Sequence, residues 1–276
     1  MEVRGAPPPP RPAALTPRDR RLLAFAAEHR IVLAAQLARL FGCSEAAMRR
    51  RLGTLRAAGL VAGTRRLRHE PIAWAITRPG LAAIGSTLGP PRPLDLAAYR
   101  HDVGLGWLAA AAHAGRFGEL SQIVTERRMR SEDARAARSA TDRLARARHG
   151  IALGGWGAGP RLHYPDLVLV TPAGHRVAVE LELTTKAPAR RERILAAYAV
   201  DPSIDAVLYL VDRPAAVRAL ARSAARAGAT GKLRVQPVAW ADGHAPGGPA
   251  HEVARSRAGG RAPSAAREPT GIGARR

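Results

Sequence analysis

Hydrophobic residues at helical spacing predict three short helices near the start of the chain. Thr16-Pro17 is typical of a helix N-terminus, and leucines and alanines recur every three or four residues after it. A second helix is predicted over residues 33–41, and a third from Ser44 to about Ala58. The rest of this part is predicted as a strand, a charged tip, a second strand and a short helix, at residues 60–61, 64–70, 72–76 and 81–88.

After a proline-rich break at residues 89–93, the pattern predicts strands alternating with helices. Leucine-rich and β-branched runs favour strands, and longer stretches with apolar residues every three or four positions favour helices. The expected order is α-β-β-β-α-β-α-β, at residues 94–114, 120–127, 166–170, 176–183, 189–198, 206–211, 214–227 and 232–237. This order predicts an α+β protein whose mixed sheet contains at least one right-handed crossover.

Segments without large apolar residues divide the chain. Residues 1–14 and 241–276 are rich in Pro, Gly, Arg and Ala, and they cannot bury enough surface to order themselves. We therefore expect disordered tails, the second of them basic. Between them the sequence predicts two domains, 15–89 and 94–238, the second of which contains an Arg-rich insertion at 128–161.

The chain is strongly basic. Its 276 residues include 44 Lys and Arg against 22 Asp and Glu, a formal net charge of +22, which favours a polyanionic partner such as nucleic acid. A single cysteine, Cys43, excludes an intramolecular disulfide and a cysteine-based zinc site. The chain lacks an apolar stretch of membrane-spanning length and the apolar core of a signal peptide. We therefore expect a cytoplasmic protein with no membrane partner.

The element order of the first domain is typical of a winged helix-turn-helix. In this DNA-binding motif a short helix, a turn, a longer helix and a basic hairpin follow one another, and the longer helix enters the major groove. The residues expected to contact DNA are Arg49, Arg50, Arg51 and Arg56 on the third helix, and Arg65, Arg66 and Arg68 at the hairpin tip. The alternative is a small helical bundle with a solvated arginine face.

Three acidic residues of the second domain are candidates for metal binding. Glu180 and Glu182 are two residues apart in a predicted strand and so project from the same side of it, and Asp166 lies across a hairpin turn from Glu180. Clustered carboxylates bind Mg²⁺ well, and the metal can activate water against a phosphodiester. Asp166 and Glu180 are the expected ligands. The alternative is an exposed strand face paired with the arginines of residues 190–193.

The second domain resembles the PD-(D/E)XK nuclease superfamily. The resemblance rests on Pro165-Asp166, on Glu180 in the next strand and on the order of elements, and it covers that whole predicted domain. It implies that these carboxylates, with Glu182 and a lysine, form a catalytic site around Mg²⁺. The superfamily's lysine stands two residues after the second acid, where this chain has Glu182, so Lys186 would have to reach back.

The chain as a whole resembles the actinobacterial replication-relaxation family. The features that carry this resemblance are Leu52–Val61, Arg100-His101-Asp102, Tyr164-Pro165-Asp166, Glu180–Lys186, Arg190, Arg193 and Tyr198. The resemblance implies a winged helix joined to a nuclease-like domain, and a setting on plasmids or mobile elements. The His-x-His metal cluster of conjugative relaxases is absent from the sequence, so we do not expect relaxase chemistry.

These patterns together predict a protein that binds double-stranded DNA. It would act in the replication or relaxation of a plasmid or mobile element, or in its regulation, with a degenerate nuclease-like domain. An active Mg²⁺-dependent DNA endonuclease and a winged-helix transcriptional regulator are the alternatives that the sequence leaves open, and a homodimer is compatible with each.

Overall fold

The computed structural model describes residues 15–65, 70–138, 148–154, 161–184, 187–241 and 245–247. The predicted N-terminal tail, most of the predicted C-terminal tail, and the predicted site residues Arg66, Arg68 and Lys186 lie outside the described residues. Within the described ranges the chain is a mixed α+β structure with eight helices and several sheets, as the sequence predicts. None of these helices is both long and apolar enough to cross a membrane.

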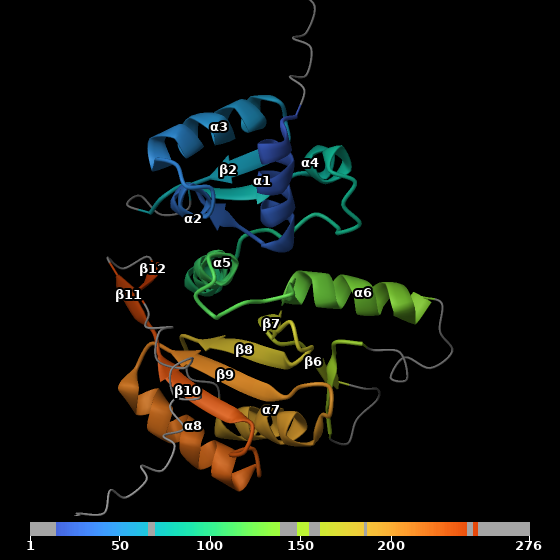
Figure 1. Cartoon of the computed structure of the whole chain (residues 1–276), viewed down its shortest axis with the longest axis vertical. Helices are drawn as coiled ribbons and strands as arrows, with labels where there is room; N and C mark the ends of the chain where they lie inside the picture. The colour runs from blue at the N-terminus through green and yellow to red at the C-terminus, as the bar shows by residue number, and fades with distance from the viewer. Residues whose placement is uncertain are drawn as a thin grey trace, which may run out of the picture.

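The first part of the chain packs four helices around a small antiparallel sheet (Figure 1). Its elements are α1 (Pro17–Glu28), β1 (Val32–Leu33), α2 (Ala34–Leu40), α3 (Glu45–Ala57), β2 (Val61–Thr64), β3 (Ala73–Ile76) and α4 (Arg78–Ala83). The strand order is β1-β3-β2, so the last strand lies in the middle and pairs with β2 as a hairpin. Leu23, Leu37 and Leu52, one from each of the first three helices, are fully buried in a shared core.

Side-chain caps explain where the first helices begin. The Thr16 hydroxyl accepts a hydrogen bond from the Asp19 amide, and the Asp19 carboxylate accepts one from the Thr16 amide, which forms a capping box. The Ser44 hydroxyl accepts a hydrogen bond from the Ala47 amide and caps α3. Gly42 has a φ of 61°, in the left-handed region that suits glycine, and so turns the chain between α2 and α3. These local signals are the reason that the predicted boundaries of the three helices agree closely with the structure.

Helix α5 (Tyr99–His113) lies between the two parts of the molecule (Figure 1). Ala109 and Ala110 are buried in the core of the first part, whereas Leu108 and Ala112 are buried against the second. The helix therefore contributes to both cores. The predicted domain boundary at 89–93 falls between α4 and α5.

A five-stranded sheet forms the second part. The remaining elements are β4 (Gln122–Thr125), α6 (Glu126–Arg138), β5 (Ile151–Leu153), β6 (Arg161–His163), β7 (Leu167–Val170), β8 (Arg176–Glu182), α7 (Pro188–Val200), β9 (Ala206–Val211), α8 (Pro214–Arg226), β10 (Leu233–Pro237), β11 (Ala239–Ala241) and β12 (Ala245–Gly247). The strand order is β10-β9-β8-β7-β4; β4, β7 and β8 pair antiparallel, and β8, β9 and β10 pair parallel. Helices α7 and α8 pack on one face, and α5 packs on the other.

The order of elements from α5 to β10 is the predicted one once α6, β5 and β6 are set aside. The described residues of the predicted insertion at 128–161 contain most of α6 and strand β5, which the sequence did not predict. Two helix starts also differ. Helix α4 begins at Arg78 because the Thr77 hydroxyl caps it, and α5 begins at Tyr99. Strand β12 lies within the predicted C-terminal tail.

Candidate functional site

Helix α3 presents arginines on the side that faces away from the core. Met48, Leu52 and Leu55 are buried, and successive helical residues are turned by about 100°, so the opposite side of the helix faces solvent. The predicted DNA-contacting residues Arg49, Arg50 and Arg56 are all exposed there. Arg49 exposes 65% of its side chain and pairs with Glu45 one turn before it. Arg65, at the end of β2, is exposed as well.

Arg51 has a different environment, which corrects its expected place on the exposed face. Its guanidinium forms an ion pair with Asp19 of α1, with Nε 2.6 Å from Oδ1. Burial alone would raise the pKa of Asp19, but hydrogen bonds from Arg51 and Thr16 outweigh it and lower the pKa below its ordinary value. Arg51 therefore fastens α3 to the capped start of α1, and we leave it out of the candidate DNA-contacting set.

A second group of cations, which sequence reasoning missed, surrounds the turn between α2 and α3. The guanidinium groups of Arg18 and Arg21 lie 5.6 and 5.5 Å from the centre of the Phe41 ring. Arg18 also donates a hydrogen bond to the Phe41 carbonyl oxygen. Both arginines come from exposed positions of α1, so the basic surface of the first part is wider than α3 alone.

The glutamates of β8 are buried, so the alternative of an exposed strand face is wrong in its exposure. Glu180 and Glu182 are 2% and 4% exposed. They lie on the α7 side of the sheet, because their neighbours Val179 and Leu181 pack on the α5 side. Of the arginines expected to pair with them, Arg191 is itself buried and its Nε donates to Ser223 of α8, while Arg190 and Arg193 are exposed.

Glu180 is held by two hydrogen-bond partners from different elements. Its Oε1 lies 2.6 Å from Nε2 of His163 on β6, and it accepts a hydrogen bond of 2.6 Å from the Tyr198 hydroxyl on α7. The two rings are nearly perpendicular, with their centres 5.7 Å apart. Burial raises the pKa of Tyr198 well above its ordinary value, and the Glu180 charge raises it further. Tyr198 is therefore a neutral phenol that donates a hydrogen bond to the Glu180 carboxylate.

Asp166 stands beside this group at the start of β7. Its Oδ2 accepts a hydrogen bond of 2.8 Å from the Leu181 amide and lies 3.2 Å from Nε2 of His101 on α5. Because Leu167 pairs with Val179 in the antiparallel register, Asp166 comes next to Glu180 as predicted.

Tyr209 of β9 lies within the electrostatic reach of all three carboxylates. Burial raises its pKa well above the ordinary value, and the charges of Glu180, Glu182 and Asp166 raise it further. The three acids are thus brought to one region of the sheet. Among the described residues, however, no three His, Cys, Asp or Glu side chains converge in a geometry that could hold a metal ion. Carboxylate oxygens are ligands that Mg²⁺ prefers, so the residues present fit the metal by chemistry.

Sequence reasoning missed His163 and the role of Tyr209. His163 is 17 residues from Glu180 in the chain, and the two side chains meet only because folding brings β6 and β8 together. The only hint in the sequence was that His163 stands three residues before Asp166, on the other side of Tyr164-Pro165.

Asp166 also lines a pocket where the two parts meet, together with Arg30, Asp102 and Glu126.

Comparison with known proteins assigns no family to the chain. No protein-family model matches it, and no curated protein matches it significantly.

Proposed function

We propose that this protein binds double-stranded DNA through its first part, which acts as a winged helix-turn-helix. The observation that carries the proposal is the element order α1-β1-α2-α3-β2-β3 with the strand order β1-β3-β2. In that motif, α3 is the helix that enters the major groove and the β2–β3 hairpin is the wing. Both elements belong to the part of the chain with the densest positive charge.

Exposed arginines support this assignment of α3. Arg49, Arg50 and Arg56 lie on its solvent-facing side, whereas its apolar residues and Arg51 hold it to the core. A guanidinium can bind a phosphate or a guanine edge with two hydrogen bonds. Residues 15–90 contain 13 arginines against four acidic residues, so this part carries a strong positive field.

The second part is proposed as a degenerate nuclease-like domain. Its antiparallel β4-β7-β8 strands followed by α7 and the parallel β9 are compatible with the resemblance to PD-(D/E)XK nucleases. The contacts of its acids argue against an active centre. Glu180 Oε1 is already bound by His163 and Tyr198, and Asp166 Oδ2 by His101 and the Leu181 amide.

The proposed setting is the replication or relaxation of a plasmid or mobile element, or its regulation. This follows from the resemblance of the whole chain to the replication-relaxation family. A winged-helix transcriptional regulator is the alternative that needs only the first part. The two are distinguished by where the protein binds: an origin or transfer region favours the first, and a promoter favours the second.

DNA binding can be tested by fluorescence anisotropy with a labelled duplex over a series of salt concentrations. Each phosphate neutralised contributes a slope of about −0.9 to the plot of log affinity against log salt. We expect a steep slope and tighter binding to duplex than to a single strand of the same length. Affinity that does not change with salt would contradict the proposal.

Nuclease activity is tested separately, by incubating linear and supercoiled DNA with Mg²⁺ or Mn²⁺. The degenerate-domain proposal predicts no cleavage. Cleavage that disappears in Asp166→Ala would establish the endonuclease instead, and would leave the DNA-binding proposal for the first part in place.

A further inference from the structure

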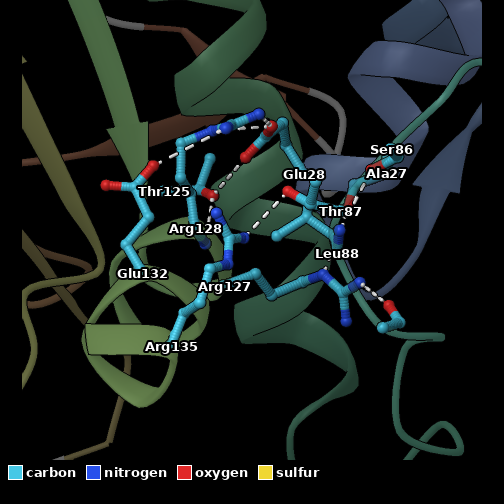
Figure 2. Close-up of polar contacts among 11 residues, drawn as sticks. Ala27, Glu28, Ser86, Thr87, Leu88, Thr125, Arg127, Arg128, Glu132 and Arg135 are labelled. Atoms are coloured by element: carbon cyan, nitrogen blue, oxygen red, sulfur yellow. Dashed lines mark hydrogen bonds and ion pairs between the residues drawn. The ribbon is translucent and has the colours of Figure 1, made fainter. Parts of the chain in front are cut away.

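The end of α1 and the start of α6 meet where the two parts of the molecule join. We call this contact the α1–α6 junction and define it by Ala27, Glu28, Thr125, Arg127 and Arg128 (Figure 2). Glu28 Oε2 accepts a hydrogen bond of 2.8 Å from the Thr125 hydroxyl, and Oε1 accepts one of 3.0 Å from Arg128 Nε. In the other direction, Arg127 Nε donates to the Ala27 carbonyl oxygen at 3.1 Å.

Each helix end at the junction receives the charge that stabilises it. A helix N-terminus carries partial positive charge, so the Glu28 carboxylate is favourably placed at the start of α6. The C-terminus carries partial negative charge, so the Arg127 guanidinium is favourably placed at the end of α1. Thr125 caps α6 as well, because its hydroxyl accepts a hydrogen bond from the Arg128 amide. The two ends are therefore complementary in charge and in hydrogen bonding.

The same helix holds the connecting segment. Arg127 Nη2 donates to the Gly89 carbonyl oxygen at 2.7 Å, and Arg135 Nη2 donates to the Thr87 hydroxyl at 2.9 Å. Residue 89 begins the predicted break between domains, and residue 87 lies just before it. This stretch is fastened to α6 at two points, so it does not behave as a free tether.

The junction adds a second attachment beside α5. Helix α5 contacts both cores through apolar residues, and it also makes directional polar contacts, in which Gln36 donates to the Val103 carbonyl oxygen, Arg30 pairs with Asp102 and His101 lies 3.2 Å from Asp166. All of these contacts lie along one helix, so a contact off its axis further restricts rotation of the first part. In Figure 1, α6 extends to the side of α5, so a contact there fixes the rotation. Charge-assisted hydrogen bonds are directional and strong enough for this.

We propose that the α1–α6 junction locks the two parts of the protein into one rigid body, and that Glu28 is the residue on which the lock depends. The inference goes beyond the proposed function and does not require DNA binding. A rigid body has a consequence for the proposed DNA binding, because α3 and the pocket lined by Asp166 would keep a fixed orientation relative to each other. Glu28 and Asp166 line the same pocket, so opening the junction would also open it.

The lock can be tested by measuring the distance distribution between two spin labels. In a Cys43→Ser background, cysteines replace the exposed Ala46 of α3 and the exposed Ala221 of α8. The parent protein is expected to give one narrow distribution. Glu28→Gln keeps the size of the side chain but removes its charge, and it is expected to broaden and shift the distribution.

Glu192→Gln is the matched control. Glu192 accepts hydrogen bonds from Nε and Nη2 of Arg226, as Glu28 does from Arg128, but its pair joins α7 to α8 within the second part. The distance distribution of the Glu192→Gln variant should stay narrow. Circular dichroism checks folding, and if Glu28→Gln does not fold, Thr125→Val and Arg127→Gln replace it. A distribution that stays narrow in the junction variants, or one that is already broad in the parent, would overturn the proposal.

Discussion

At the scale of single residues, burial and local charge decide which side chains titrate and which stay neutral. His29, at the end of α1, is buried beside Phe25, with the two ring centres 4.6 Å apart. Burial, together with the charges of the nearby His113 and Arg127, lowers the pKa of His29 to about 3. The folded protein therefore holds this imidazole neutral under conditions in which the unfolded chain would protonate it.

His29 leads to a prediction about acid stability. Because its folded pKa lies below the ordinary value of 6.5, the unfolded state binds the proton first, and stability falls as the pH drops from about 6.5 towards 3. The slope contributed by one such group is at most about 1.4 kcal/mol per pH unit. Urea unfolding of His29→Gln across this range should show a weaker pH dependence than the parent. Equal slopes in the parent and in His29→Gln would contradict the assignment of this pH dependence to His29.

Single residues also show what the sequence could and could not foretell. The caps at Thr16 and Ser44 act within a few residues, so the helix starts followed from the sequence. The ion pair of Arg51 was not predicted, because helical spacing gives its angle on α3 but not the presence of Asp19 across the interface. The buried partners of Glu180 depend on how distant strands and α7 pack, which spacing along the chain does not encode.

At the scale of elements, the contact between α2 and α5 joins the two cores through a buried amide. Gln36 is fully buried; its Oε1 accepts a hydrogen bond from the Leu33 amide, and its Nε2 donates to the Val103 carbonyl oxygen, each at 2.8 Å. A Cβ at Gly106 would lie 2.6 Å from the Gln36 Oε1. Glycine at this position is therefore a requirement of close helix packing rather than of backbone conformation.

This contact predicts opposite outcomes for two helical glycines. Gly106→Ala should lower the free energy of unfolding by about 1–3 kcal/mol, because Gln36 must move out of its hydrogen bonds. Gly53→Ala on α3 meets nothing within 4 Å, and it should be neutral or raise that free energy by up to about 1 kcal/mol. Chemical denaturation measures both. A Gly106→Ala protein as stable as the parent would show that the contact adapts freely.

The element order of the second part was predictable, but helix α6 was not. Strands β7, β8 and β9 are compact apolar runs with clear turns, so periodicity found them. Helix α6 has only Met129 and Asp133 buried, and its run of Arg and Ala offers no apolar stripe. Its position depends on tertiary contacts, namely the α1–α6 junction and the Asp133 carboxylate, which accepts hydrogen bonds from the amides of residues 148–150.

At the scale of the whole molecule, the arginines differ in their contacts although the chain as a whole is strongly basic. Those of α6 at positions 127 and 128 hold the two parts together, and Arg51 holds α3 to α1. Those on the outer side of α3 remain exposed to solvent. If only the exposed set binds DNA, the position of an arginine, and not net charge, determines its effect on affinity.

The most direct test of DNA binding by α3 compares two double variants with the same loss of charge. Arg50→Ala with Arg56→Ala removes exposed arginines of α3, and Arg218→Ala with Arg222→Ala removes exposed arginines of α8, on the far side of the sheet. In anisotropy titrations over a salt series, the α3 pair should weaken duplex binding and reduce the salt slope by about 2. The α8 pair should bind nearly as the parent does. Equal losses from both pairs, or none from the α3 pair, would contradict the account.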